Sequence, residues 1–126
     1  MITEDYVSFE TAKLLKEKGF DDEYTNAFYD KSGILYFIDI LSDFSEHTDN
    51  DTDIAASTLY VAMKWLREVH NINIDIVPIW NQKRFEYQVF VVTPENAKHY
   101  YIDDKLYLGY EQACEAAIKY CLENLI

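Results

Sequence analysis

The residues best suited to metal or acid–base chemistry in this chain are three histidines, and their spacing argues against a shared site. His47, His70 and His99 lie far apart, and none stands two to five residues from another His or a Cys. Zinc sites are commonly built from such close pairs, so we expect no zinc site of standard spacing. His70 falls at the end of an expected helix, where an imidazole interacts favourably with the helix dipole.

Carboxylates offer the next candidate chemistry. Residues 49–53, Asp-Asn-Asp-Thr-Asp, supply oxygen atoms at alternate positions, as the first half of a calcium-binding loop does. The sixth position is Ile54 instead of Gly and the twelfth is Tyr60 instead of Glu, so the second half of that loop is missing. We therefore predict no tight metal site at residues 49–53. A second group of carboxylates, the pair Asp103-Asp104, is typical of a solvated turn.

Neither the glycines nor the cysteines indicate a cofactor or a catalytic residue. The three glycines form no glycine-rich phosphate-binding motif. Cys114 and Cys121 are seven residues apart on one expected helix, which separates their Cα atoms by about 10 Å and is too far for a disulfide. We interpret both as small buried apolar residues, and we predict no cofactor and no catalytic site.

Composition and charge indicate a folded acidic protein. The 126 residues are 49% hydrophobic and 16% aromatic, which suits a single domain spanning 1–126. The net charge of −12 argues against direct binding to nucleic acid, since phosphate contacts need clustered Lys and Arg. Residues 57–100 are an exception with a slight basic excess, and Lys83-Arg84 is their only basic pair. No apolar run reaches the length of a signal core or a membrane span, so we expect a cytoplasmic location and no membrane contact.

Hydrophobic periodicity predicts three helices and four or five strands. Helices are expected over 8–18, 58–70 and 110–126, with Ser8 and Ser57 as N-caps and Gly19 as a stop. Strands are expected over 24–29 and 34–41, then from 72 to a stop at Pro78, then over 85–91, with a short fifth strand within 100–108. The order α-β-β-α-β-β(-β)-α favours an α+β fold with one antiparallel sheet of four to five strands, and with Leu66, Ile118 and Leu122 buried.

Two groups of apolar or aromatic residues exceed what a small core requires and suggest a protein interface. The second helix carries one stripe for its own sheet and a second stripe beside it, so its apolar arc is wide enough to contact two surfaces. Tyrosines crowd the segment before the last helix, and tyrosine is common at interfaces because it joins apolar area to a polar end. The candidate interface residues are Val61, Trp65, Val69, Tyr100, Tyr101 and Tyr107.

Three segments resemble a known group of proteins. They are ITEDYVSFETAKLLKEKGF at 2–20, AMKWLREVH at 62–70 and EQACEAAIKYCLENL at 111–125. They resemble small uncharacterised proteins encoded by phages and mobile elements in the genomes of gut Bacteroidetes. The resemblance covers about a third of the chain, mainly the expected helices. It implies a genomic setting, and no site residue is carried over from it.

The sequence therefore favours a non-enzymatic, phage- or mobile-element-associated module that binds a protein partner or a second copy of itself. One alternative is an acidic mimic of nucleic acid that inhibits a DNA-binding or defence protein, with carboxylates in place of phosphates. A second alternative is a small enzyme, which requires a concave pocket lined by convergent polar groups.

Overall fold

The computed structural model describes residues 2–38, 52–101 and 105–126, and within them the chain forms two compact units. The first unit ends at Thr58 and the second begins at Leu59. The first contains helix α1 (Phe9–Glu17) and strands β1 (Ala27–Tyr29), β2 (Leu35–Phe37) and β3 (Ile54–Ala55). The second contains helices α2 (Leu59–His70) and α3 (Tyr110–Asn124) and strands β4 (Ile72–Ile79), β5 (Arg84–Val92) and β6 (Ala97–Tyr101).

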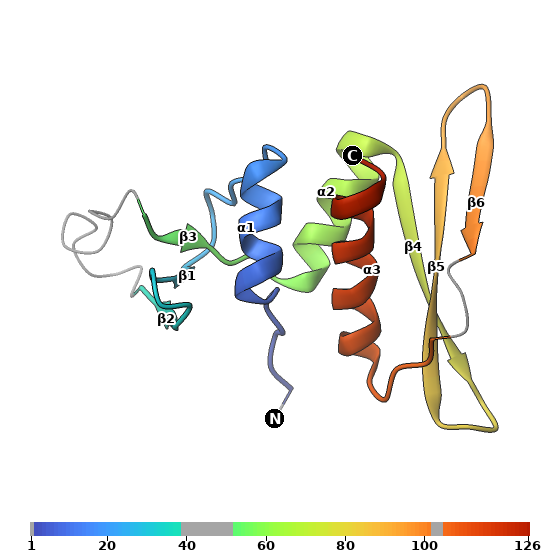
Figure 1. The fold of residues 1–126 in the computed structure, drawn as a ribbon, viewed down its shortest axis with the longest axis horizontal. Helices are drawn as coiled ribbons and strands as arrows, with labels where there is room; N and C mark the ends of the chain where they lie inside the picture. Colours follow the sequence, from blue (N-terminus) through green and yellow to red (C-terminus); the bar gives the residue numbers. More distant parts are fainter. Residues whose placement is uncertain (1, 39–51, 102–104) are drawn as a thin grey trace. The chain divides into compact units, whose positions relative to one another are not determined.

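In the first unit, three short antiparallel strands form a sheet in the order β2-β1-β3 (Figure 1). Phe28 in β1 lies opposite Tyr36 in β2 and opposite Ala55 in β3. The turn from β1 to β2 is the predicted one, and it closes at Gly33, whose φ of 81° suits glycine. Strand β3 is only two residues long and lies before the second helix, where we expected no strand, so that part of the prediction is wrong.

Helix α1 begins and ends as its sequence predicts. The Ser8 side chain accepts a hydrogen bond from the Thr11 N–H at 3.2 Å, and Gly19 follows the helix with a φ of 98°. Ala12 and Leu15 are buried, as is Val7 just before the helix. The Tyr29 hydroxyl donates a 2.6 Å hydrogen bond to the Val7 carbonyl, which joins β1 to the chain that enters α1.

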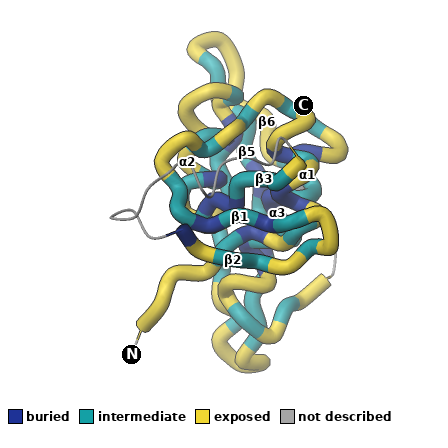
Figure 2. Tube along the Cα trace, turned by 90° about the vertical axis from the view of Figure 1, so that its left-hand side faces the viewer, coloured by how far each residue is buried: buried dark blue, intermediate teal, exposed yellow. Residues whose placement is uncertain are grey.

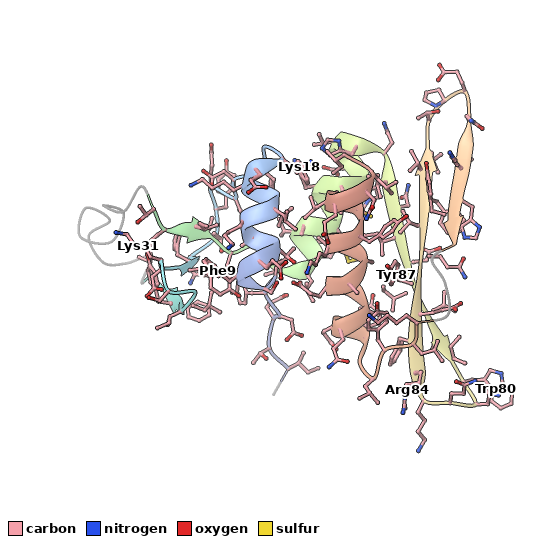
Figure 3. All side chains as sticks on the ribbon, viewed as in Figure 1. Phe9, Lys18, Lys31, Trp80, Arg84 and Tyr87 are labelled. Carbon is pink, nitrogen blue, oxygen red and sulfur yellow. The ribbon has the colours of Figure 1, made fainter. Side chains whose placement is uncertain are left out.

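In the second unit, α2 and α3 lie on one side of an antiparallel sheet with the order β4-β5-β6 (Figure 1). Alternation of side chains places Tyr87 and Val89 of β5 in the core beneath the helices, and Tyr87 points toward α3 (Figure 3). Strand β4 passes through Pro78 and ends at Ile79, so the predicted stop at Pro78 is wrong. After β6, Tyr107 returns to pair with Phe85 of β5 through two hydrogen bonds of 2.8 Å.

Helix α3 supplies much of the core of the second unit. The burial expected for Cys114, Ile118, Cys121 and Leu122 is confirmed, and Ala117 on the same face is also buried. The helix packs against β4, β5 and α2. Leu66 of α2 is also completely buried, so all three core residues named from the sequence are confirmed.

Burial of Cys121 predicts a particular loss of stability at alkaline pH. Burial raises the pKa of this thiol from 9.0 to about 12. The folded protein therefore disfavours the thiolate that the unfolded chain forms freely above pH 9, so stability decreases as the pH rises from 9 to 12. We expect the stability advantage of the wild type over Cys121→Ala, measured by denaturant unfolding, to shrink over this range. A difference that stays constant with pH would contradict this assignment.

The predicted α+β class with three helices is confirmed, but the single sheet of four to five strands is wrong. The described residues form two three-stranded sheets, in the order α-β-β-β-α-β-β-β-α. Each pair of expected strands gains a third strand from the chain that follows it. Strand β3, which we did not predict, pairs with β1, and β6, which overlaps the short strand expected within 100–108, pairs with β5. The prediction of one domain over 1–126 stays a prediction. No helix in the described ranges is both long and apolar enough to cross a membrane.

Candidate functional site

The first unit has an open polar hollow of about 250 Å³ lined by Asp30, Lys31, Ser32 and Asp53. Several of the polar groups that line it form hydrogen bonds within the β1–β2 turn. The Asp30 carboxylate accepts hydrogen bonds from the N–H groups of Ser32, at 2.8 Å, and Ile34, at 3.1 Å. This carboxylate stabilises the turn, as Asp commonly does at the start of a tight turn.

The second carboxylate of the hollow also has a local partner. The Tyr36 hydroxyl of β2 donates a hydrogen bond to Asp53, which lies just before β3. Burial and, to a smaller extent, the hydrogen bond to Asp53 together raise the pKa of Tyr36 to about 12. The phenol therefore stays neutral at physiological pH and links β2 to the segment that precedes β3. This pairing has a structural explanation and needs no ligand.

The candidate metal chemistry gains no support from the described part of the chain. No group of three or more His, Cys, Asp or Glu among those residues is arranged to hold a metal ion. Within the acidic segment 49–53, residues 49–51 lie outside the described residues, so the predicted lack of tight calcium binding stays a prediction. His47 lies outside them as well.

The other two histidines pack against aromatic rings. His70 ends α2, with its ring 4.7 Å from the Trp65 ring in an edge-to-face arrangement, and its buried Nε2 atom has no hydrogen-bond partner within the described ranges. His99 of β6 stacks on Phe90 of β5, with ring centres 4.4 Å apart. Both cysteines are buried, and neither forms a disulfide. The structure does not bring these groups together as a catalytic set.

Ser57 does not act as the predicted N-cap of the second helix. Its hydroxyl is buried and has no hydrogen-bond partner in the part of the chain that the structure describes. Helix α2 begins two residues later, at Leu59. The prediction is wrong because the chain at Ser57 is engaged elsewhere: its carbonyl accepts a 3.0 Å hydrogen bond from the Val7 N–H.

The most prominent surface feature of the second unit is the tip of the β4–β5 hairpin, formed by residues 80–84. Trp80 is 90% exposed there, and the same turn contains Lys83 and Arg84. Trp80 and Arg84 extend from opposite sides of the tip (Figure 3). Along the chain, both hairpin turns of this unit are exposed (Figure 2). An exposed indole on a charged turn resembles the aromatic and Arg residues that dominate binding at protein interfaces.

Several hydrogen bonds fix this hairpin tip. The Gln82 N–H donates to the Ile79 carbonyl at 3.1 Å, which closes the turn. The Arg84 guanidinium donates from Nη1 to the carbonyls of Gln82 and Lys83, each at 3.2 Å. The turn also holds Lys83 at a φ of 51°, a left-handed conformation that is uncommon for lysine. Trp80 is therefore presented on an ordered turn at the end of a regular ladder.

The predicted interface residues of α2 fall on one flank of that helix. Val69 exposes 57% of its side chain, whereas Val61 and Trp65 are half-buried. Trp65 lies against His70, so part of its area is used within the helix. The flank is incompletely covered, mainly at its C-terminal end.

The predicted tyrosines lie at different places in the fold, Tyr100 and Tyr101 in β6 and Tyr107 beside β5. The Lys98 ammonium lies 5.0 Å from the centre of the Tyr100 ring on β6, and Tyr101 pairs with Gln88 in the ladder. Tyr107 is half-buried, with its ring 6.0 Å from that of the buried Tyr87. Tyr107 thus contributes to the core of its own unit.

Trp80 is not among the interface residues predicted from the sequence. A signal was present, because Trp80 opens the polar stretch Asn81-Gln82-Lys83-Arg84 between two strongly alternating strands. A large aromatic residue at a hairpin turn has little chance of reaching the core, so its position alone suggests an exposed ring. Comparison with family models, with curated proteins and with solved structures finds no match to this chain.

Proposed function

We propose that this chain is a non-enzymatic protein-binding module in which the β4–β5 hairpin tip anchors a partner. The exposed Trp80 is the observation that carries the proposal. Transfer of an indole from water into a partner's pocket is strongly favourable, and the fixed turn lowers the entropy lost on binding. The earlier resemblance to phage and mobile-element proteins supports a role in such an element.

The cations beside Trp80 favour a partner with an acidic rim around its pocket. Lys83 and Arg84 add two positive charges to a turn that has no acidic residue. The rest of the chain is strongly acidic, so the tip differs from it in charge as well as in apolar area. A contact confined to the tip uses this local charge, because exposed charges beyond about 8 Å are screened at physiological salt.

A matched pair of variants tests the proposal. We expect affinity capture from host cells to retain a protein on the wild type that Trp80→Ser no longer holds. With that protein purified, Trp80→Ser should weaken the affinity by about 30-fold, the effect of losing a 2 kcal/mol hot spot. Tyr24→Ser is the control, because Tyr24 is 93% exposed in the first unit and loses a comparable aromatic ring.

Two results would contradict the proposal. An equal loss of binding in Trp80→Ser and Tyr24→Ser would show that the hairpin tip does not anchor the partner. A captured protein that binds DNA, dissociates at high salt and is insensitive to Trp80→Ser would instead favour the nucleic-acid mimic.

A further inference from the structure

The outer edge of β4 is a second surface suited to binding. Strand β4 stands at one end of the β4-β5-β6 sheet, and no described strand pairs with its other side. It is eight residues long, which leaves a row of backbone groups at the edge. Long edges without a neighbouring strand readily accept a further strand.

The hydrogen-bond pattern shows which residues face this edge. In an antiparallel ladder, the backbone N–H and C=O groups of one residue bond to the neighbouring strand, and those of the next residue point away from that strand. The Val92 N–H donates to the Asn71 carbonyl at 3.0 Å, so the next β4 residue that bonds to β5 is Asn73. The backbone N–H and C=O groups of Ile72, Ile74 and Ile76 therefore point outward, together with the Pro78 carbonyl.

Pro78 provides an independent check of this assignment. Proline has no N–H to donate and is tolerated within a sheet only where that group would face an open edge. The alternation places Pro78 at such a position. Phe85, opposite Pro78, correspondingly bonds to Tyr107 on the far side of β5.

We propose that the β4 edge pairs with the β4 edge of a second copy of this chain. A twofold axis through Ile74 would place Ile74 opposite its own counterpart and Ile72 opposite Ile76 of the second copy. This register joins the two sheets by about six backbone hydrogen bonds and leaves the Pro78 position outside the paired region. The proposal does not depend on the hairpin tip.

Side chains on the outer face of the sheet favour this register. It places the Asn73 amide opposite the Asp75 carboxylate of the second copy, and a second such pair forms by symmetry. Shifting the axis to Asp75 would place two carboxylates directly opposite each other, which is destabilising. The Ile74-centred register is therefore self-complementary in both backbone and side chains.

Helix α2 strengthens the argument for a second copy as the occupant. It packs on β4, and its flank leaves Val69 57% exposed. The twofold axis is perpendicular to the joined sheet, so both copies of α2 lie on the same side of it. The exposed Val69 of each copy would then lie on the same face of the dimer.

Amide exchange tests the edge directly in the unmodified protein. As the protein concentration rises, light scattering should show conversion of monomer to dimer. Over the same range, exchange of the Ile74 and Ile76 amides should slow by about tenfold or more as they become hydrogen-bonded. A monomer at every concentration, with rapid exchange of both amides, would overturn the proposal.

Two substitutions at Asn73 test the register with opposite signs. Asn73→Lys should lower the dissociation constant of the dimer, because the new ammonium group faces the Asp75 carboxylate of the second copy. Asn73→Asp should raise the dissociation constant by about tenfold, because it places two carboxylates opposite each other. Both change an outward side chain and should leave the melting of the monomer nearly unaltered. A dimer whose dissociation constant is the same in both variants would refute pairing through this edge.

Discussion

Replacing Leu122 with Ala is expected to lower the free energy of unfolding by about 2–5 kcal/mol. Leu122 is completely buried on α3, so the truncation removes apolar contacts and leaves a cavity that the surrounding helices and sheet fill only in part. Denaturant unfolding followed by circular dichroism measures the change. The matched control is Leu108→Ala, because Leu108 is largely exposed and should lose less than about 0.5 kcal/mol. Similar losses in the two variants would show that α3 does not pack as described.

Replacing Gly33 with Ala is expected to destabilise the first unit by about 2 kcal/mol or more. Gly33 has a φ of 81°, and an added Cβ would lie 2.9 Å from Cδ2 of Phe9. The variant therefore combines backbone strain with a clash against a ring. That ring itself lies 5.5 Å from the ring of Tyr29, which restricts its movement.

Gly19→Ala, measured in the same unfolding experiment, separates the cost of backbone strain from the cost of the clash with Phe9. Gly19 has a φ of 98°, but its added Cβ would meet nothing within 4 Å. We expect this strain alone to lower the free energy of unfolding by about 1 kcal/mol, which is clearly less than the loss expected for Gly33→Ala. Equal effects would indicate that Phe9 moves away freely and does not hold the turn in place.

The helices could be predicted from the sequence because their signals are local. Ser8 caps α1 and Gly19 ends it, and the spacing of Cys114, Ile118 and Leu122 defines the buried face of α3. Each signal lies within a few residues of its effect. The periodicity of β5 is local in the same way, so its core residues Tyr87 and Val89 could also be identified.

The pairing of strands could not be predicted in the same way, because it depends on distant residues. Strand β3 has only two residues and no periodicity, yet it pairs with β1 more than twenty residues earlier in the chain. Pro78 was misleading for a related reason. Proline stops a central strand but not an edge strand, and the sequence alone does not reveal that β4 is at an edge.

The candidate surface was predictable only in part. The wide apolar arc of α2 indicated a flank that is incompletely covered, and Val69 is indeed exposed. The tyrosines were harder to interpret, because Tyr107 packs beside Tyr87 whereas Tyr100 lies on an edge strand. Residue type alone does not distinguish these environments. Trp80 required knowledge of where β4 ends and the turn begins.

The most direct test of the protein-binding proposal is the fluorescence of Trp80. The chain has two tryptophans, so Trp65→Phe leaves Trp80 as the only indole and retains an aromatic ring beside His70. Free protein should emit as a water-exposed indole and be readily quenched by acrylamide. When the captured partner is added to saturation, we predict a blue shift and strong protection from quenching. An unchanged spectrum and unchanged quenching with the partner bound would contradict the claim that the hairpin tip anchors the complex.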